Sequence, residues 1–401
     1  MKLWEEIEVA RKKIQKIILR TPMIYSDTFS RLTGKEVFLK LENLQKTGSF
    51  KIRGAYYKLS QLTPSMKKKG VVAASAGNHA QGVALASSIL GIHSTIVMPE
   101  GVSLAKQMAT QAYGGEIVLA GQNTDEALHH AKKLTGDGRL LIHPFDDEQV
   151  IAGQGTIGLE ILEEVPRVEA IIVPIGGGGL ISGIAAIVKK RRPGVKMIGV
   201  QSFHAPSAFY SFKRKKVVNA TVKPTLADGI AIQQVGEITF PMIQKRVDQI
   251  VRVEEDEIAS SILMLMERKR IVAEGAGASP LAALLSKGLK TNLKKIVLVV
   301  SGGNIDFHLL DRIIEKGLAQ TGRLIRMSIL LRDVPGSLST LTNLIARHRA
   351  NILHIIHERT AKEIPMGFSK VILVLETRGS DHIREIQQGV RARGYSLLMS
   401  S

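Results

Sequence analysis

The sequence contains no cysteine, and this absence excludes several kinds of chemistry at once. Without a thiol the chain forms no disulfide bond, has no thiolate nucleophile and offers no sulfur ligand to a metal. Aromatic residues are also scarce, at 4% of the 401 residues. This scarcity argues against the stacking surfaces on which proteins bind the bases of single-stranded nucleic acids. A chain without cysteine fits the cytoplasm, and we predict that location.

Long apolar runs are absent as well. No uninterrupted apolar stretch approaches the roughly 18 residues that suggest a membrane span, so we expect no membrane partner. The first 20 residues do not read as a signal peptide, because Glu5, Glu6 and Glu8 interrupt them and no apolar segment follows. Apolar residues recur there at helical spacing, which predicts an ordinary docked helix. They are Leu3, Ile7, Ala10, Ile14 and Ile17.

The sequence has a large excess of positive charge, formally +19 at pH 7. A nucleic-acid-binding protein would use such charge to neutralise phosphates. A solvated surface rich in lysine and arginine would give the same excess. The second interpretation is favoured, because the basic clusters at 66–70, 189–193 and 212–216 are scattered along a chain poor in aromatic residues. We therefore predict no nucleic-acid partner.

From about residue 36 to 315, short β-type runs alternate with helix-type segments. This alternation predicts an α/β fold with open, mostly parallel sheets. The predicted strands are 36–42, 70–75, 94–99, 116–120, 139–144, 170–175, 195–201 and 295–301. The predicted helices between them include 78–90, 103–112, 123–135, 147–163, 179–191, 256–269 and 303–316. Several strands end in small or polar loops, and ligands of such sheets bind at these carboxyl ends.

After a linker at 315–323 the pattern changes. The order becomes strand, helix, strand, strand, helix, strand, which is the ferredoxin-like plan. The predicted strands are 325–332, 352–360, 367–376 and 395–399, and the predicted helices are 337–349 and 380–393. The chain therefore divides near residue 320.

Four consecutive glycines, Gly176–Gly179, follow a predicted strand and lead into a helix. Their main-chain N–H groups can approach a phosphate closely because no Cβ intervenes, and the helix dipole adds attraction. A tight turn is the alternative, but one or two glycines suffice for a turn. The run matches neither G-x-G-x-x-G nor G-x-x-x-x-G-K-[ST], so it does not indicate a dinucleotide or a nucleoside triphosphate. We predict a phosphate monoester site.

Two other strand ends carry groups that bind ligand oxygen or nitrogen atoms. Ser75, Gly77 and Asn78 offer hydroxyl, main-chain and amide donors to a carboxylate or a phenolate. His79 is either a general base or a residue that supports the helix beginning there, and we favour the supporting role. Ser301 ends the last strand and can give one hydrogen bond. No histidine spacing typical of a metal site occurs, so we predict no metal.

Lys51 lies between Gly48-Ser49-Phe50 and Gly54, where the chain enters a helix. One interpretation is a helix-terminal lysine in a salt bridge. The other is a desolvated amine, which loses part of its preference for a proton and becomes a nucleophile towards aldehydes. A buried amine and a glycine phosphate cup together indicate pyridoxal 5'-phosphate, bound covalently by the lysine and electrostatically by the cup.

The same segments resemble a known family. They are GSFKIRGA (48–55), SAGNHAQGVA (75–84), PIGGGGLISGI (174–184), AEGAGA (273–278) and SGGN (301–304). In this order they resemble the threonine dehydratase branch of the fold type II (β-family) pyridoxal-phosphate enzymes, over roughly residues 5 to 315. The resemblance implies a catalytic domain at 1–318 whose small subdomain, roughly 45–147, is inserted in the larger one.

The resemblance also implies roles at matching positions. Lys51 would carry the cofactor as an internal aldimine, and Phe50 would pack beside its ring. Ser301 would face the pyridine nitrogen and leave it largely unprotonated, which favours β-elimination over transamination. Glu274 would lie near the site. Asn78 would hydrogen-bond the 3-hydroxyl oxygen. The substrate carboxylate would be received by Ser75, Ala76, Gly77 and Asn78, and the phosphate by Gly176, Gly177, Gly178, Gly179 and Leu180.

The implied activity is that of an ammonia-lyase. Lys51 would remove the Cα proton, and loss of the β-hydroxyl would give 2-oxobutanoate and ammonia from threonine, or pyruvate and ammonia from serine. Related serine racemases have a second serine where this chain has Ala76, and metal ligands where it has Gln201 and Ser207. A racemase or a β-replacement synthase is one alternative. An amino-acid sensor or nucleic-acid-binding protein with an idle catalytic fold is the other, and the intact Lys51 and glycine cup argue against it.

The segment RDVPGSLSTLTNLIARHRANI (332–352) resembles an ACT regulatory domain, which would cover 325–401. Pro335-Gly336 and Asn351 are explained by turn chemistry alone. The resemblance implies that such turns, paired across a dimer interface, bind a free amino acid, with Gly336 and Asn351 at the effector site. We expect isoleucine or valine as the effector and a link to isoleucine biosynthesis. An open-edged sheet also favours pairing, so we predict a homodimer or homotetramer.

Overall fold

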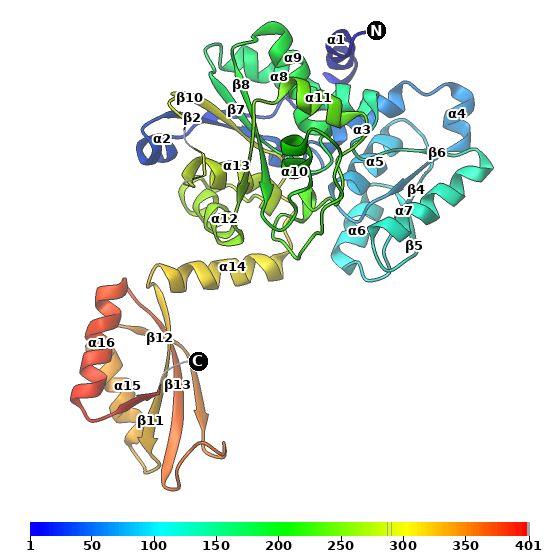
Figure 1. Cartoon of the computed structure of the whole chain (residues 1–401). Coiled ribbons are helices and arrows are strands. Elements are labelled where there is room, and N and C mark those ends of the chain that lie inside the picture. The colour runs from blue at the N-terminus through cyan, green and yellow to red at the C-terminus, as the bar shows by residue number, and fades with distance from the viewer. Residues whose placement is uncertain (287, 290, 399–401) are drawn as a thin grey trace. The chain divides into compact units, whose positions relative to one another are not determined.

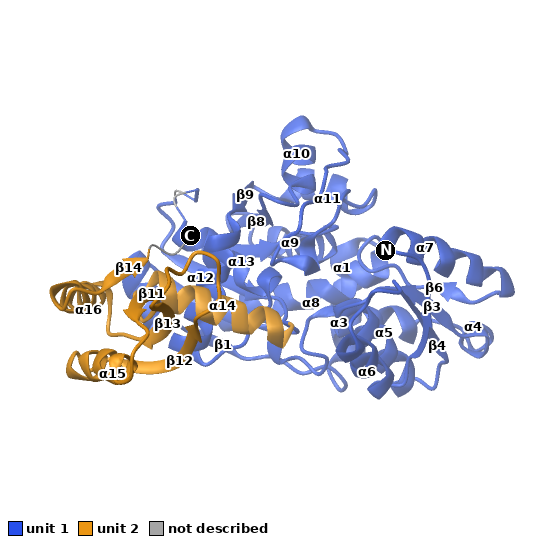
Figure 2. Cartoon of the chain, turned by 90° about the horizontal axis from the view of Figure 1, so that it is seen from below, with its two compact units in different colours: residues 1–305 blue, residues 306–401 orange. Residues whose placement is uncertain are grey.

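The computed structural model describes residues 1–286, 288–289 and 291–398. Contacts divide the chain into two compact units, residues 1–305 and 306–401, shown in blue and orange in Figure 2. The helix α14 (Phe307–Gln320) belongs to the second unit. Residue 318, the predicted end of the catalytic domain, therefore lies inside this helix.

The larger sheet of the first unit has six strands (Figure 1). Its order is β1-β2-β10-β7-β8-β9, in which β1 is antiparallel to β2 and the other neighbouring pairs are parallel. The strands are β1 (Met23–Tyr25), β2 (Glu36–Leu41), β7 (Ala170–Pro174), β8 (Lys196–Ser202), β9 (Gln249–Val253) and β10 (Lys295–Val300). Every residue of β7 is buried, as expected for a central parallel strand covered on both faces.

A second sheet of four parallel strands lies in the chain between β2 and β7. Its order is β5-β4-β3-β6. The strands are β3 (Val71–Ala74), β4 (Ser94–Met98), β5 (Glu116–Leu119) and β6 (Leu140–Leu141). The predicted fold class is thus confirmed: the sheets are open and mostly parallel, and a smaller subdomain is inserted in the larger one.

Helices cover both sheets. Before β7 they are α1 (Leu3–Ile14), α2 (Asp27–Thr33), α3 (Lys51–Ser60), α4 (Pro64–Lys69), α5 (Asn78–Ile89), α6 (Leu104–Ala112), α7 (Thr124–Lys133) and α8 (Glu148–Glu164). After β7 they are α9 (Gly179–Arg191), α10 (Ser207–Arg214), α11 (Thr239–Arg246), α12 (Glu255–Lys269) and α13 (Gly275–Leu285). Short 3-10 turns are η1 (Glu42–Leu44), η2 (Leu134–Asp137) and η3 (Asp228–Ile230). Figure 1 shows α1, α8 and α9 on one side of the larger sheet and α12 and α13 on the other.

Parallel topology brings helix N-termini to the carboxyl ends of the strands. Helix α5 begins at Asn78, four residues after β3 ends at Ala74, and α9 begins at Gly179 after β7 ends at Pro174. Helix N-termini carry main-chain N–H groups without partners in their own helix, and a partial positive charge. The fold therefore gathers hydrogen-bond donors from both sheets at one edge.

The second unit has its own sheet and core. The antiparallel order is β12-β13-β11-β14, with α15 and α16 packed against it. Its elements are β11 (Leu324–Arg332), α15 (Ser337–Arg347), β12 (Asn351–Glu358), β13 (Phe368–Glu376), α16 (Ser380–Ala392) and β14 (Ser396–Leu398). This confirms the predicted ferredoxin-like plan. Residue 399, the predicted end of the last strand, lies outside the described residues.

Some elements differ from the predictions. Strands β1 and β9 were not predicted, and β1 has only three residues at the edge of the sheet. Helix α13 was not predicted either, because its sequence GAGASPLAALL contains two glycines and Pro280, which are poor helix formers. The first helix was predicted to include Ile17 but ends at Ile14.

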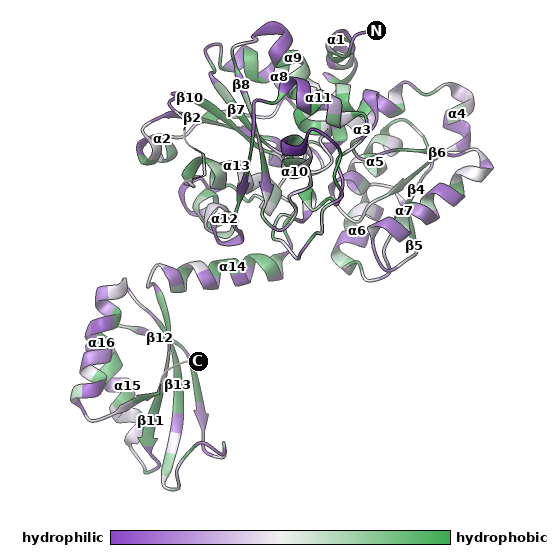
Figure 3. Ribbon diagram, in the orientation of Figure 1, coloured by the Kyte–Doolittle hydropathy of each residue, from purple (hydrophilic) through white to green (hydrophobic). Residues whose placement is uncertain are grey.

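Hydrophobic residues concentrate on the strands in Figure 3, whereas outer helices such as α4 and α7 carry many hydrophilic ones. Among the described residues, no helix combines the length and the apolar character needed to cross a bilayer.

Helices α8 and α9 pack closely because glycines face each other at their contact. A Cβ atom on Gly183 of α9 would overlap the carbonyl oxygen of Ile151 and lie 2.7 Å from the main-chain nitrogen of Gly155, both on α8. A Cβ atom on Gly155 would in turn lie 2.9 Å from the carbonyl oxygen of Gly183. Main-chain atoms cannot move aside without displacing a helix.

We expect Gly183→Ala to lower the free energy of unfolding by about 1–3 kcal/mol, because overpacking forces α8 and α9 apart. Urea unfolding measures this loss. Gly194→Ala is the control, because a Cβ atom on Gly194 meets open space. Equal stability of the two variants would contradict the close packing of the helices.

Candidate active site

A cavity of about 890 Å³ lies where the carboxyl ends of the strands of both sheets meet. It is lined by every residue that the sequence analysis predicted to bind cofactor or substrate. These residues are Phe50, Lys51, Ser75, Ala76, Gly77, Asn78, Gly176, Gly177, Gly178, Gly179, Leu180 and Ser301. The fold thus brings together groups from four separate segments of the chain.

Lys51 is the first residue of α3, and its side chain reaches the cavity. The Nζ atom donates a hydrogen bond to the carbonyl oxygen of Pro144 at 2.8 Å and lies 5.3 Å from the centre of the Phe50 ring. Burial lowers the pKa of Lys51 to about 8, and the negative charge of Glu274 partly opposes this effect. The amine is therefore partly neutral near physiological pH.

The segment before Lys51 is tied to the loop that follows β10. The main-chain N–H of Phe50 donates to the carbonyl oxygen of Ser301 at 3.1 Å, and Ser49 forms an isolated β-bridge with Gly302. The N–H of Gly303 donates to the carbonyl oxygen of Gly48 at 2.9 Å. These bonds place Ser301 beside the residue that precedes the lysine.

The glycine run forms the start of α9. Gly178 has a φ of +99°, in the left-handed region that favours glycine. No acceptor among the described residues receives a hydrogen bond from the main-chain N–H groups of residues 176–180. The Phe145 ring packs against Gly177 so closely that a Cβ atom there would overlap it. Free N–H groups at the N-terminus of a helix form an anion site.

Asn78 links two further residues. Its amide nitrogen donates to both carboxylate oxygens of Glu274, at 2.8 and 2.9 Å. Its carbonyl oxygen accepts a hydrogen bond from the amide nitrogen of Asn304 at 2.7 Å. If both contacts with Glu274 share one hydrogen, the second amide hydrogen of Asn78 is left for a ligand.

Glu274 precedes α13 and is buried beside the cavity. Burial, with the charge of Asp228, raises the pKa of Glu274 to about 7, although the hydrogen bond from Asn78 opposes this rise. Burial thus shifts the pKa values of the lysine and the carboxylate towards each other.

The two histidines near the cavity have structural contacts. The Nε2 atom of His79 lies 2.9 Å from the carbonyl oxygen of Ile142, and burial, with the charge of Lys51, lowers the pKa of His79 to about 3. His79 is thus neutral at physiological pH and uses Nε2–H as a donor. The Nδ1 atom of His143 accepts from the main-chain N–H of Asp146 at 2.8 Å. These contacts agree with a supporting role for His79.

The loop that follows β6 was not predicted from the sequence. The predicted strand 139–144 is wrong at its end, because β6 stops at Leu141 and the chain then turns past the cavity. Pro144 accepts the hydrogen bond of Lys51, and Phe145 covers the glycine run. The proline within the predicted strand was a signal, since proline is rare in sheet interiors.

Gln201 and Ser207, which the resemblance aligns with metal ligands of racemases, have protein partners here. The amide nitrogen of Gln201 donates to the carbonyl oxygen of Ile175 at 3.2 Å, and its carbonyl oxygen accepts from the N–H of Phe209 at 2.9 Å. Ser207 is buried beside it. The described residues contain no cluster of three or more His, Asp or Glu side chains suited to a metal ion.

The predicted effector residues lie in the second unit. Gly336 precedes α15 with a φ of +89°, and Asn351 begins β12. The amide nitrogen of Asn351 lies 3.4 Å from a carboxylate oxygen of Glu376.

Comparison with known proteins gives consistent matches. A family described as "Pyridoxal-phosphate dependent enzyme" matches residues 14–302, and one described as "ACT domain" matches 325–391. The chain is 49% identical to the L-threonine ammonia-lyase of Thermotoga maritima over 394 residues, 98% of each chain.

Solved structures match about three quarters of the chain. A threonine deaminase isoform of Solanum lycopersicum has a TM-score of 0.75 at 38% identity, covering 78% of this chain and 87% of that one. Maize serine racemase has a TM-score of 0.74 at 36% identity, covering 78% and 98%. The deaminase and the racemase are thus equally similar to this chain in fold. The full-length sequence match to the L-threonine ammonia-lyase favours the lyase.

The lowered pKa predicts a measurable reactivity. In protein without cofactor, we expect the rate of reductive methylation of Lys51 to reach half its maximum near pH 8. Exposed lysines ordinarily titrate near 10.4, so their rates should still rise strongly above pH 9. Peptide mass spectrometry after brief labelling at a series of pH values reports both. A Lys51 profile that coincides with that of exposed lysines would contradict the burial of its amine.

Proposed function

The chain belongs to the family of pyridoxal-phosphate dependent enzymes, and we propose that it is an L-threonine ammonia-lyase. The reaction is the β-elimination of L-threonine to 2-oxobutanoate and ammonia, with L-serine giving pyruvate and ammonia. The observation that carries this proposal is the partly neutral amine of Lys51 in one cavity with a glycine run whose N–H groups are free. The full-length similarity to a lyase of this name supports it.

The residues of the cavity fit pyridoxal phosphate. The N–H groups of Gly176, Gly177, Gly178, Gly179 and Leu180 suit its phosphate, and Lys51 suits its aldehyde. The buried Nε2 atom of Gln154, also in the cavity wall, has no hydrogen-bond partner among the described residues. In our proposal Asn78 donates to the 3-hydroxyl oxygen, Ser301 faces the ring nitrogen, and Phe50 packs beside the ring.

The chain contributes a base and a loop that binds the substrate carboxylate. Pyridoxal phosphate, when bound, acidifies the Cα–H bond of the substrate by withdrawing electrons from it. The amine of Lys51 takes this proton, because its pKa of about 8 leaves part of it neutral and because it already lies in the cavity. The loop Ser75–Asn78 holds the substrate carboxylate and thereby points Cα towards the lysine.

Serine racemase is the alternative that the fold permits. Racemisation needs a second proton-carrying group on the face of the substrate opposite Lys51. Ala76 lines the cavity at the position where such racemases have a serine, and its methyl group carries no exchangeable proton. Elimination is therefore favoured over racemisation.

We expect Lys51→Ala to lower kcat/KM for threonine by about 10³-fold or more, because the variant lacks the proton acceptor. It should also lose the visible absorbance of a lysine-bound cofactor. Lys68→Ala, at an exposed position of α4, is the control and should keep both. Product analysis with threonine and serine completes the test: D-amino acid in place of 2-oxo acid and ammonia would refute the lyase assignment.

We further propose that the second unit binds a regulatory amino acid and pairs with a second copy of the chain, as a homodimer or homotetramer. Strand β12 is an edge strand of its sheet and exposes Leu353, Ile355 and Ile356. Exposed apolar edge strands favour pairing with another chain. Gly336 and Asn351, at the ends of the loops around α15, would contact the effector, isoleucine or valine.

Saturating isoleucine or valine should change the threonine KM or kcat at least about 5-fold, the usual lower range of allosteric coupling. Asn351→Ala should remove this response and leave activity without effector unchanged. Glu363→Gln, exposed in the turn before β13, is the matched control. Absence of both isoleucine and valine binding to the full chain in calorimetry would disprove the effector site.

A further inference from the structure

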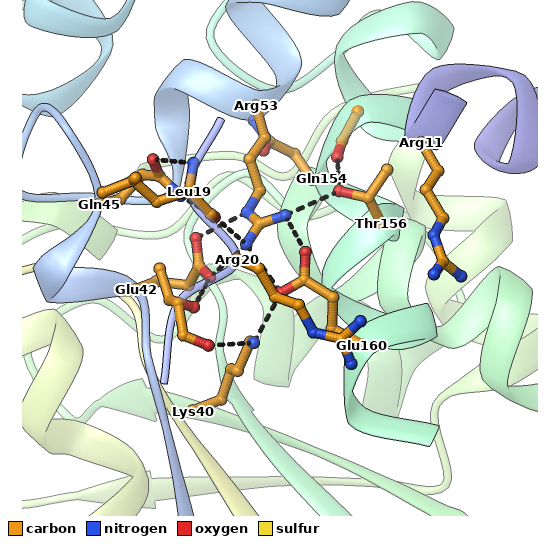
Figure 4. Close-up of polar contacts among 12 residues, drawn as sticks. Arg11, Leu19, Arg20, Lys40, Glu42, Gln45, Arg53, Gln154, Thr156 and Glu160 are labelled. Carbon is orange, nitrogen blue, oxygen red and sulfur yellow. Dashed lines mark hydrogen bonds and ion pairs between the residues drawn. The ribbon is translucent and has the colours of Figure 1, made fainter. Parts of the chain in front are cut away.

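Arg53 lies two residues after Lys51 and is 1% exposed, among the largest fully buried side chains of the chain. Its guanidinium binds two carboxylates, as Figure 4 shows. Nε and Nη2 donate to the two oxygens of Glu42, each at 2.8 Å. Nη1 and Nη2 donate to the two oxygens of Glu160, at 2.6 and 3.0 Å. Both carboxylates are therefore bound through two oxygens.

Two weaker bonds complete the contacts of the guanidinium. Nη1 donates to the hydroxyl oxygen of Thr156 at 3.2 Å, and Nη2 donates to the carbonyl oxygen of Leu19 at 3.3 Å. Arginine has five N–H donors in a rigid planar fork, and here all three nitrogens are engaged. A lysine at this position has one nitrogen and cannot bind both carboxylates in this way.

The charges of this cluster balance. Lys40, also fully buried, lies with its Nζ atom 2.6 Å from Glu160 and donates to the carbonyl oxygen of Thr21 at 2.8 Å. Two buried cations thus face two buried carboxylates, Glu42 and Glu160, and Lys40 also lies 3.9 Å from the partly exposed carboxylate of Glu164. Burial would lower the pKa of Arg53, but the two carboxylates outweigh it and raise the pKa above its usual value. Arg53 therefore stays charged at physiological pH.

The cluster connects four parts of the first unit. Arg53 is on α3, Glu42 begins η1 directly after β2, Glu160 is on α8, and Leu19 is in the segment after α1. Residues two apart in an α-helix point about 200° apart around its axis. Lys51 therefore faces the cavity from one side of the first turn of α3 while Arg53 anchors the opposite side.

The first turn of α3 depends on such an anchor. No side chain caps its N-terminus. Neighbouring helices approach it through glycines: a Cβ atom on Gly153 of α8 would lie 2.6 Å from the carbonyl oxygen of Arg53, and one on Gly82 of α5 would lie 3.1 Å from the carbonyl carbon of Lys51. This packing limits how far the turn can shift, and the bonds of Arg53 fix its rotation.

We propose that Arg53 is a positioning residue for Lys51, holding the first turn of α3 so that the amine stays in place for proton transfer. This inference rests on the proposed function, in which Lys51 is the base. Stability alone does not explain four buried charges, because well-packed apolar residues are often as stable as a buried ion pair. Fixed geometry does explain them, since a displacement of 1 Å at a reacting group can cost about 10²-fold in rate.

Arg53→Lys tests the proposal in two ways. We expect kcat for threonine to fall about 10- to 100-fold while KM changes less than about 3-fold, because the carboxylate-binding loop is untouched. In protein without cofactor, the midpoint of Lys51 methylation should rise by about one pH unit as water reaches the loosened amine. Lys189→Met is the control: it breaks the 2.7 Å ion pair with Asp248 at the far end of α9. This variant should lower thermal stability and leave both kcat for threonine and the midpoint of Lys51 methylation unchanged.

Thr156→Val is the second variant, and it decides the question if Arg53→Lys does not fold. It removes the 3.2 Å bond from Arg53 and the 2.6 Å bond to the carbonyl oxygen of Gly153, with almost no change in side-chain volume. We expect a 2- to 5-fold loss of kcat and a small rise in the methylation midpoint. The proposal would be overturned if these variants lost stability but kept the kcat and the Lys51 methylation midpoint of the parent protein. If the parent protein did not convert threonine while the Lys51 midpoint still shifted, the activity assignment would fail and the positioning role would stand.

Discussion

Burial and a neighbouring carboxylate act in opposite directions on one amine, and the site depends on their balance. Burial lowers the pKa of Lys51 to about 8, and Glu274 limits the shift. Glu274 is itself buried, and its pKa rises to about 7. Each group therefore exists in both protonation states near neutral pH. A fully exposed lysine would be too strongly protonated to act as a base, and an unopposed buried charge would destabilise the fold.

The position of that amine follows from several restraints that act together. Main-chain bonds tie the segment before it to the loop after β10, and the carbonyl oxygen of Pro144 holds its Nζ atom. On the opposite side of α3, the buried guanidinium of Arg53 binds Glu42, directly after β2, and Glu160 of α8. Glycines at 82 and 153 let α5 and α8 approach the same turn. The site is thus a local arrangement that relies on the packing of the whole first unit.

Much of this arrangement could be predicted from the sequence. Alternating strand and helix patterns gave the α/β class, and short segments at strand ends identified the groups of the cavity, because parallel topology places those ends together. The loop 142–147 was not found, since HPFDD has no periodicity and its proline was counted within a strand. Arg53 was not found either. A sequence shows that an arginine exists, but only the fold shows which carboxylates it meets, 11 and 107 positions away in the chain.

The inserted sheet has a consequence for how the first unit unfolds. Asn78 follows a strand of the smaller sheet, whereas the glycine run and Ser301 follow strands of the larger one. A single bound molecule that contacts all of them would join the carboxyl ends of two sheets that already share one hydrophobic core, since Val71 and Ala73 belong to the same buried cluster as Ile171 and Val173. Such a ligand couples the two sheets thermodynamically. Because the two sheets share this core, the first unit is expected to melt in one step, and a bound cofactor would raise the temperature of that step by stabilising the folded state.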